Sequence, residues 1–320
     1  MLTNYPASEN TGLSRGARDA WWIDLLQPTN EEIARVESTY DLQLPSRQEL
    51  SEVESSSRVS ERNGVLFLST PSVSHLSGLD QTSSPIGFVL SKDLLVTIRY
   101  TNLRSFDKVA EKFSKHVGPA TSIEAFAALV DEMVDLSADL LEEIAAELDG
   151  MSRAVFSRLG RKRRHPTRSN DELRHLLIGV GNAGARLSHT RDSLLGLQRI
   201  VRFVSGTKRD WIPQEMRDHL DTPHNDLLSL TEYETHLSDK VQFLLDAVLG
   251  FINTKQNDIF QALTVISVVG IPPTLVASIY GMNFRNIPEF NWAWGYPFGL
   301  ALIVISAVVP LLLFKWRRWV

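Results

Sequence analysis

Two long stretches without a charged side chain lie near the C-terminus and constrain the fold more than any other feature. Residues 259–284 form a run of 26 and residues 290–314 a run of 25, and neither contains Asp, Glu, Lys or Arg. A helix that crosses a bilayer needs roughly 20 predominantly apolar residues. Each run is therefore long enough for one membrane-spanning helix, and a pair of spans places both chain ends on the same side.

The charges beside these runs indicate which side of the membrane the chain ends occupy. Lys315, Arg317 and Arg318 follow the second run at once, whereas the connecting segment carries only Arg285 and Glu289. Positive charge is enriched on the cytosolic side of membrane helices, so we expect cytoplasmic N- and C-termini. Aromatic residues that suit a lipid interface lie near the two ends of the second run. They are Trp292, Trp294 and Tyr296 at its start, and Trp316 and Trp319 after its end.

The composition argues against several other classes of protein. The 320 residues include no cysteine, which excludes disulfides and thiolate metal sites. The net charge of −5 argues against nucleic acid as a partner and suits the attraction of cations. Residues 1–10 have neither a basic segment nor an apolar core, so we expect no secretory signal. No nucleophile and base can be paired from their spacing, so we expect no enzyme.

Residues 1–120 are expected to form a cytosolic α/β domain. Thr29-Asn30-Glu31-Glu32 predicts a helix N-terminus, because threonine or asparagine caps the first turn and the helix dipole favours carboxylates there. A second helix is expected over residues 46–54. Apolar or β-branched runs bounded by Gly, Ser, Pro and Asp predict strands at 21–26, 65–69, 86–90 and 94–100.

Helical periodicity replaces this mixed pattern from Ser105 onward. Two long helices are predicted over residues 122–159 and 170–204, with Gly160 and Pro166 in the segment between them. The predicted fold class is therefore an N-terminal α/β domain followed by long helices and a two-helix transmembrane hairpin.

A third long helix is expected to begin near Gln214 and to continue into the first span. Thr222-Pro223 and Pro272-Pro273 are expected to kink it. The remaining divisions are a long-helix region at 121–212, a stalk helix at 213–258, the first span at 259–284, an external loop at 285–291, the second span at 292–314 and a basic tail at 315–320.

The polar side chains of the first span are sorted to one side. At 100° per residue they fall within a sector of roughly 140°. Two interpretations stay open: polar groups avoid hydrocarbon by lining a water-filled path, or they mediate packing between helices. Asn253 and Asn257 continue this face, and the span contributes Gln261, Thr264, Ser267, Thr274 and Ser278.

Three short motifs follow the polar face. They are Tyr280-Gly281-Met282-Asn283-Phe284, Ile287-Pro288-Glu289-Phe290 and Trp294-Gly295-Tyr296-Pro297, and the chain ends in Lys315-Trp316-Arg317-Arg318-Trp319-Val320. With these motifs the sequence resembles the CorA family of magnesium channels. Gly250-Phe251-Ile252-Asn253 and the Pro-Pro-Thr-Leu-Val-Ala run at 272–277 resemble its proteobacterial branch. The likeness is strong from about Asn225 onward and upstream rests on the order of elements.

The resemblance implies a homopentamer in the bacterial inner membrane. First spans would ring a pore, and second spans would face membrane lipid. Gly281, Met282 and Asn283 would form the selectivity filter, with Glu289 in the external loop. The pore lining would comprise Asn257, Phe260, Leu263, Ser267, Ile271, Thr274 and Ser278, with Asp246 at the cytosolic mouth.

The same resemblance implies passive influx of Mg²⁺, with Co²⁺ or Ni²⁺ as further ions, and closure by intracellular Mg²⁺ bound between cytosolic domains. Mg²⁺ is thus the transported and the regulatory ion, and no organic cofactor is expected. Glu49 matches one regulatory carboxylate, and Asp218 or Asp221 would be its partner. Ser278 replaces a glycine common in the family, and Phe260, Ile271 and Ile287 replace methionines, which implies a stiffer or narrower gate.

Two alternatives to a magnesium channel remain open. Zinc transporters share the architecture but usually vary the residue between Gly281 and Asn283, so Met282 favours magnesium. A membrane-anchored sensor or structural protein would conduct nothing.

Three further patterns are interpreted as structural. Gly179, Gly181 and Gly184 match a dinucleotide fingerprint, but they lie inside a predicted helix and indicate close helix packing. His219 and His224 lack a third zinc ligand. The basic cluster at 161–164 is interpreted as a solvated turn between helices, with anionic lipid or an acidic neighbouring helix as alternative partners.

Overall fold

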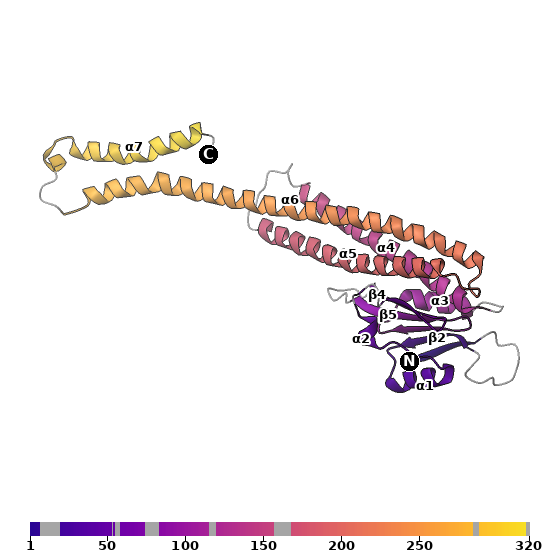
Figure 1. The fold of residues 1–320 in the computed structure, drawn as a ribbon. Coiled ribbons are helices and arrows are strands. Elements are labelled where there is room, and N and C mark those ends of the chain that lie inside the picture. Colours follow the sequence, from indigo (N-terminus) through magenta and orange to yellow (C-terminus); the bar gives the residue numbers. More distant parts are fainter. Residues whose placement is uncertain are drawn as a thin grey trace. The chain divides into compact units, whose positions relative to one another are not determined.

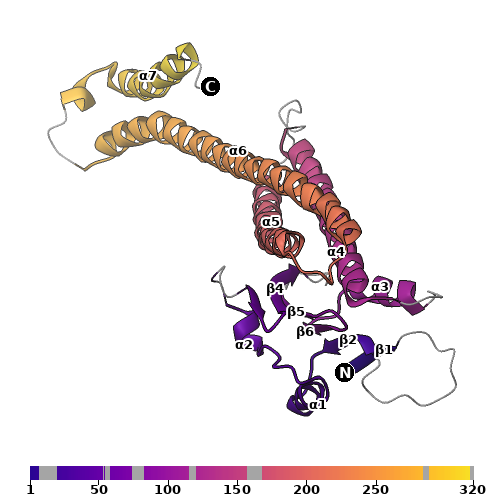
Figure 2. The ribbon, with the colours of Figure 1, turned by 45° about the vertical axis from the view of Figure 1, so that its right-hand side comes forward.

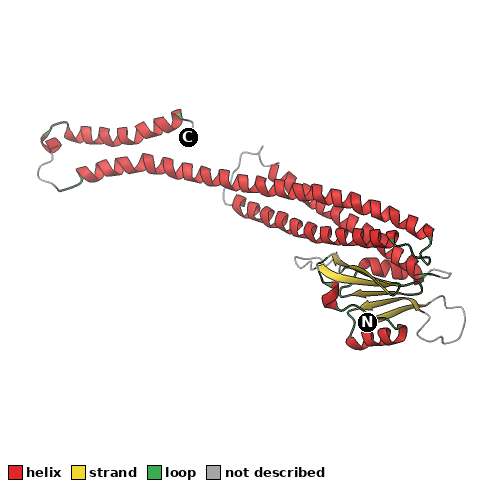
Figure 3. Cartoon of the chain, in the orientation of Figure 1, coloured by secondary structure: helices red, strands yellow, loops and turns green. Residues whose placement is uncertain are grey.

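The computed structural model describes residues 1–6, 20–52, 54, 58–73, 83–114, 120–156, 168–283 and 288–317. Strands dominate the first part of the chain and helices the rest (Figures 1 and 3). The elements are β1 (Leu2–Pro6), β2 (Ala20–Leu26), α1 (Asn30–Tyr40), α2 (Arg47–Leu50), β3 (Val59–Arg62), β4 (Val65–Val73), β5 (Ser83–Leu90), β6 (Leu95–Arg99), α3 (Arg104–Ser114), α4 (Ser122–Phe156), α5 (Arg168–Gly206), α6 (Gln214–Tyr280), η2 (Pro288–Asn291) and α7 (Gly295–Trp316).

The chain divides into two compact units, each described separately below. The first unit comprises Met1–Pro166 and Arg174–Leu245, and the second comprises Thr167–Leu173 and Asp246–Val320. Helix α6 contributes residues to both.

The first unit contains a six-stranded sheet with strand order β1-β2-β6-β5-β4-β3. Strands β2 and β6 pair in parallel, with Asp24 opposite Thr97, and the other neighbours are antiparallel. The four strands predicted from apolar runs are confirmed. Strands β1 and β3 were not predicted, because Leu2–Pro6 ends in proline and Val59–Arg62 is short and half charged.

Both faces of the sheet are covered, as Figures 1 and 2 show: α1 lies on one side and α3, α4 and α5 on the other. The α1 side buries Ile23, Leu25 and Val96 against Val36 and Leu50. The opposite side packs aromatic and branched residues against α3 and α4, including Trp22, Leu66, Phe88, Leu95, Phe106 and Phe126. Two-sided burial explains why the central strands are apolar runs rather than alternating ones.

The predicted N-terminus of α1 is confirmed down to its atoms. The Glu32 N–H donates to Thr29 Oγ1 at 3.2 Å, and the Thr29 N–H donates to Glu32 Oε2 at 3.0 Å, so the two residues form a capping box. The predicted second helix is shorter than expected, since α2 spans only Arg47–Leu50.

Helices α4, α5 and α6 share one apolar core in the first unit, with ion pairs along its edge. Arg186 on α5 holds Glu143 at 2.7 Å and Glu147 at 2.8 Å, both on α4. Lys240 on α6 holds Asp149 of α4 at 2.5 Å. The predicted helices are therefore confirmed where the structure describes them, and residues 157–159 and the basic cluster at 161–164 lie outside the described residues.

The glycine pattern in α5 serves helix packing, as predicted. A Cβ at Gly179 would come within 2.9 Å of Met151 on α4, and one at Gly184 within 3.3 Å of Val241 on α6. Gly181 has open space around it. Because these glycines lie inside a 39-residue helix, a dinucleotide loop is excluded.

Candidate functional site

The second unit contains two apolar helical segments. Among the described residues, α6 and α7 are the helices long and apolar enough to cross a membrane. Their apolar windows are exposed in the single chain, with Phe260 at 66%, Ile271 at 63% and Leu312 at 58%. Apolar surface of this extent needs a cover, which lipid or further protein can supply.

Helix α6 continues without interruption through the prolines of the first span. The expected kink at Pro272-Pro273 therefore does not end the helix, although neither proline can donate a backbone hydrogen bond. Thr274, the next residue, donates its hydroxyl to the Gly270 carbonyl oxygen at 2.8 Å. One helical phase therefore extends over residues 246–280, and the angular position of each side chain can be compared along it.

The proposed pore residues share one seam of α6. At 100° per residue, the six from Phe260 to Ser278 fall within a sector of about 80°, and Asp246 and Asn257 widen it to about 120°. Seven of these eight residues are exposed in the single chain, and Ser267 is partly buried. The seam therefore contains both apolar side chains, Phe260, Leu263 and Ile271, and polar ones along a single line.

The threonine hydroxyls of the first span donate within the helix. Thr264 Oγ1 donates to the Phe260 carbonyl oxygen at 2.7 Å, as Thr274 does to Gly270. Their hydrogens are therefore satisfied in apolar surroundings, while the oxygen lone pairs stay able to accept. These two hydroxyls therefore present acceptors on the helix surface while their own hydrogens are already paired.

The Gly281-Met282-Asn283 motif, which the sequence predicts to be the filter, begins where α6 ends. The Gly281 N–H donates to the Ala277 carbonyl oxygen at 3.0 Å, and the Met282 N–H donates to the Ile279 carbonyl oxygen at 3.2 Å. Asn283 follows as an exposed residue. The C-terminus of a helix carries partial negative charge and carbonyl groups without intrahelical partners, so a cation is favoured here. Phe284, Arg285 and Ile287 lie outside the described residues.

The segment between α6 and α7, predicted to be an external loop, is fixed against the start of α7. Helix η2 contains Glu289, whose carbonyl oxygen accepts from the Trp292 N–H at 3.2 Å. Gly295 is buried beside this carbonyl, and a Cβ at Gly295 would overlap the oxygen. The sequence places Gly295 in a motif but gives no sign of this close approach, so its structural role was missed.

Glu49 holds the N-terminus of α2. Its Oε2 accepts from the Ser46 N–H at 2.7 Å, and this hydrogen bond holds the pKa of Glu49 below its ordinary value. The side chain lines a cavity of about 360 Å³, whose other charged lining residues are Glu52, Arg58 and Arg62. One carboxylate oxygen is thus engaged in capping.

Asp218 and Asp221 are exposed near the start of α6. Asp218 Oδ1 accepts from Gln214 Nε2 at 2.7 Å. Among the described residues, neither aspartate forms a hydrogen bond with Glu49 or shifts its pKa. The same part of the chain contains no cluster of three or more Asp, Glu or His residues that could hold a metal. Within one chain, these carboxylates are therefore not brought together.

The two histidines are not brought together as ligands either. His219 Nε2 lies 2.9 Å from Asp131 Oδ2 on α4. His224 has a buried Nδ1 without a hydrogen-bond partner among the described residues.

Comparison with known proteins gives a consistent result over almost the whole chain. The family model described as CorA-like Mg²⁺ transporter protein matches residues 18–317. The chain is 33% identical over 307 residues to the magnesium transport protein CorA of Wolinella succinogenes, covering 93% of this chain and 90% of that protein. It is 30% identical to the protein of the same name from Salmonella typhimurium, covering 96% and 94%.

Solved structures share the fold. The complete CorA magnesium transporter from Methanocaldococcus jannaschii matches with a TM-score of 0.78 at 18% identity, covering 100% of this chain and 99% of that one. The full-length CmaX protein matches with a TM-score of 0.68 at 19% identity, covering 93% and 88%.

Proposed function

The chain belongs to the CorA-like family of Mg²⁺ transporters, and we propose that it forms a homopentameric channel for Mg²⁺ entry across the bacterial inner membrane. One α6 helix from each copy would contribute its seam to a central pore, and α7 would face lipid. Both chain ends would lie in the cytoplasm, as the basic residues after α7 favour.

The seam on α6 carries this proposal. A helix that serves only as an anchor has no need to gather Ser267, Thr274 and Ser278 on one line that ends at a carbonyl-rich terminus. A ring of such helices places these acceptors around an axis and covers the exposed apolar residues with neighbouring copies and lipid. Phe260, Leu263 and Ile271 would form an apolar constriction, which closes a pore by excluding water.

Asn283 would select the ion at the outer end of α6. Mg²⁺ dehydrates reluctantly and keeps several waters when it binds. Amide and backbone carbonyl oxygens accept hydrogen bonds from those waters without replacing them, and uncharged ligands release the ion readily. Glu289 in the nearby loop would add negative charge and raise the local cation concentration.

The membrane potential would drive the ion inward. An inside-negative potential contributes about 2.3 kcal/mol per elementary charge per 100 mV, and twice that for a divalent ion. Co²⁺ and Ni²⁺ would follow the same path, since a filter that contacts hydration waters distinguishes these ions weakly.

Intracellular Mg²⁺ would close the channel by binding between cytosolic domains. Glu49 of one copy would share the ion with Asp218 or Asp221 of the next, because carboxylate oxygens are ligands that Mg²⁺ prefers. Asp221 is exposed, and Glu49 keeps one carboxylate oxygen beyond its capping bond, so both can accept a ligand role.

A liposome flux assay tests the transport proposal. Purified full-length chain in liposomes should admit Mg²⁺ under an inside-negative potential, and Asn283→Ala should remove most of that flux. Ala262→Val, at an exposed position of the same helix outside the seam, is the matched control and should leave the flux unchanged. A wild-type flux that persists in Asn283→Ala contradicts the filter assignment.

The same assay, together with the oligomeric state of the protein in mild detergent, separates the alternatives. Flux of Zn²⁺ that outcompetes Mg²⁺ would favour a zinc transporter. A protein that is monomeric or dimeric in mild detergent and carries no flux would instead be a non-conducting sensor or structural protein.

A further inference from the structure

A groove in the first unit lies outside the proposed ion path. It is formed by the C-terminal part of α5, the early part of α6 and strand β3, and its volume is about 660 Å³. Pockets for small organic ligands span about 300–1,000 Å³, so this groove falls within their range. We call it the α5–α6 groove.

The α5–α6 groove has one basic and one apolar side. Its basic side chains are Arg199, Arg202 and His224, and its large apolar ones include Leu195, Phe203 and Leu228. Among the residues that the structure describes, no carboxylate lines it. A surface of this kind is complementary to a molecule with an anionic group and an apolar or ring-shaped part.

The two groove arginines differ from others on the same helix. Arg186 pairs with Glu143 and Glu147, and Arg191 pairs with Glu234, which is buried to 1% exposure. No ion pair or hydrogen bond of Arg199 or Arg202 is recorded among the described residues. Within the described part of the chain, these two arginines therefore have no ion-pair partner, although Asp192 lies on the same helix.

Two further observations favour an anionic ligand in this groove. Burial lowers the pKa of Arg58, the nearby positive charge of Arg199 lowers it further, and Asp192 opposes the shift. In the wall of the groove, Nδ1 of His224 is buried without a hydrogen-bond partner in the described residues. Like charges close together and a buried polar atom without a hydrogen bond both cost free energy. A ligand that supplies negative charge and a hydrogen-bond partner would remove this cost.

We propose that the α5–α6 groove binds a small organic anion that carries a phosphate group. Arg199 and Arg202, which are three residues apart on α5, would hold the phosphate, since guanidinium groups donate paired hydrogen bonds to phosphate oxygens. His224 would complete the contact, and Phe203 and Leu228 would cover the organic part. This site would make the channel responsive to a cytosolic phosphate compound, independently of Mg²⁺.

Calorimetric titration of the full-length chain in mild detergent tests the proposal. Adenosine monophosphate is the first probe, with a chelator present so that divalent cations play no part. We expect saturable binding to the wild type and at least about a tenfold weaker affinity for Arg199→Gln/Arg202→Gln, because charge-assisted hydrogen bonds are lost. Arg174→Gln, an exposed arginine of α5 outside the groove, is the control and should bind as the wild type does.

Further probes identify which part of the ligand is recognised. Adenosine should not bind, and inorganic phosphate should bind more weakly than adenosine monophosphate. Binding of adenosine with equal affinity would overturn the role of the arginines, and equal or tighter binding of inorganic phosphate would overturn the role of the apolar side.

A measurement of thermal unfolding shows whether the double variant keeps the wild-type fold. The thermal transition of the double variant should match the wild type, and if it does not, the single variant Arg202→Gln at an exposed position replaces it. Absence of saturable binding to the wild type, or affinity unchanged in the arginine variant, overturns the proposal. Because no flux is measured, either result is independent of whether the chain transports Mg²⁺.

Discussion

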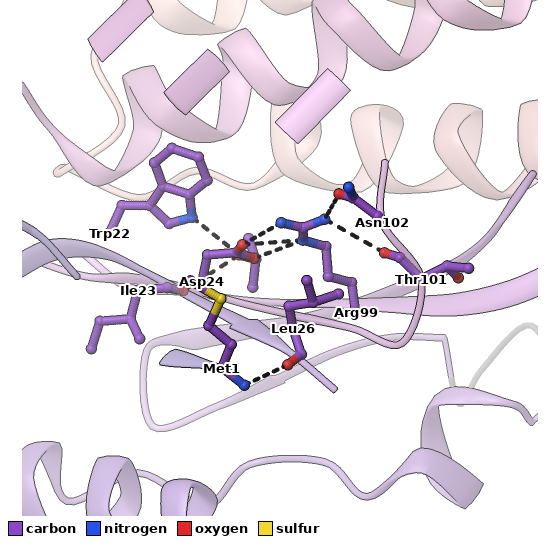
Figure 4. A network of polar contacts seen from close by, with 9 residues as sticks. Met1, Trp22, Ile23, Asp24, Leu26, Arg99, Thr101 and Asn102 are labelled. Carbon is purple, nitrogen blue, oxygen red and sulfur yellow. Dashed lines mark hydrogen bonds and ion pairs between the residues drawn. The ribbon is translucent and has the colours of Figure 1, made fainter. Parts of the chain in front are cut away.

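Asp24 and Arg99 form an ion pair in the interior of the first unit, between the parallel strands β2 and β6. Arg99 Nη2 lies 2.8 Å from Asp24 Oδ2, and the two side chains are 7% and 5% exposed (Figure 4). Thr97 donates its hydroxyl to Asp24 Oδ1 at 2.8 Å, Trp22 Nε1 donates to Thr97 at 3.1 Å, and Asn102 Oδ1 accepts from Arg99 at 3.0 Å. The charges are thus paired and hydrogen-bonded, as burial requires.

Removal of one partner should be far more harmful than removal of both. Asp24→Ala leaves the Arg99 guanidinium buried without its counter-ion, and we expect a loss of about 3–5 kcal/mol in the free energy of unfolding. Asp24→Leu/Arg99→Met replaces the pair by apolar groups and should lose much less. Denaturant unfolding of the full-length chain in detergent, followed by tryptophan fluorescence, measures both. A double variant as unstable as Asp24→Ala would contradict this account.

At Gly196, helix α5 lies close against strand β4. A Cβ there would overlap Thr70 Oγ1 and come within 3.0 Å of Thr70 Cβ and 3.2 Å of Pro71 Cδ. Gly196→Ala should therefore force α5 away from the sheet and destabilise the protein by about 1–3 kcal/mol, the usual cost of overpacking. Thermal unfolding of the full-length chain measures this loss.

Gly181→Ala provides the matched control on the same helix. Nothing lies within 4 Å of a Cβ at Gly181, so the substitution relieves the low helix propensity of glycine without a clash. It should be neutral or stabilise by up to about 1 kcal/mol. Equal destabilisation by both substitutions would show that helix propensity, rather than contact with Thr70, decides the outcome at Gly196.

Local signals in the sequence predicted local structure correctly. The capping residues Thr29 and Glu32 lie three positions apart, so their pairing is visible in the sequence itself. The same is true of the central strands and of the seam on α6, whose angular order follows from helical spacing alone. The helical environment of Gly179–Gly184 was predicted for the same reason.

Contacts between distant segments could not be predicted from the sequence in this way. Asp24 interrupts an apolar run, but nothing nearby indicates that Arg99, 75 positions along, neutralises it. The overlap of Gly196 with Thr70 and the gathering of Arg199 with His224 likewise depend on how helices pack against the sheet. The proposed regulatory site would be formed by two copies, so one chain brings Glu49 near neither aspartate.

Glu49 has a capping role and a proposed regulatory role, and substitution can separate them. Glu49→Gln keeps the hydrogen bond to the Ser46 N–H, since glutamine also serves in a capping box, but it removes the charge that Mg²⁺ would need. We expect only a small loss of stability at neutral pH, because the charge that strengthens the capping hydrogen bond is absent, and weaker inhibition of flux by internal Mg²⁺. Glu49→Ala should lose both properties. Inhibition that is unchanged in Glu49→Gln would limit Glu49 to its structural role.

The pH dependence provides a second measurement on Glu49. Hydrogen bonds from Ser46 hold the pKa of Glu49 below its ordinary value of 4.5, so the folded state favours the charged carboxylate. This contribution to stability is present above the unfolded-state pKa and is lost as the pH falls through the lowered folded-state pKa. Thermal unfolding between pH 7 and pH 3 should therefore show a smaller acid-induced loss in Glu49→Gln than in the wild type.

Gly295 and Glu289 determine how the loop after α6 meets α7. A Cβ at Gly295 would overlap the Glu289 carbonyl oxygen, so Gly295→Ala must displace the short helix that carries Glu289. If Glu289 concentrates cations at the pore entrance, its displacement should reduce flux most at low external Mg²⁺ and least at saturation. Liposome flux over a range of external Mg²⁺ distinguishes this effect from a loss of functional protein, which would lower the flux by the same factor at every concentration.

Gly299→Ala is the control for Gly295→Ala, because Gly299 is also buried in α7 but has open space within 4 Å. It should leave the flux unchanged at every Mg²⁺ concentration. Glu289→Gln should reproduce the low-concentration defect, and combining it with Gly295→Ala should add little, since both changes remove the same charge from the same place. A defect in Gly295→Ala that is equal at low and saturating Mg²⁺ would instead indicate that the glycine supports the pore helices rather than the entrance.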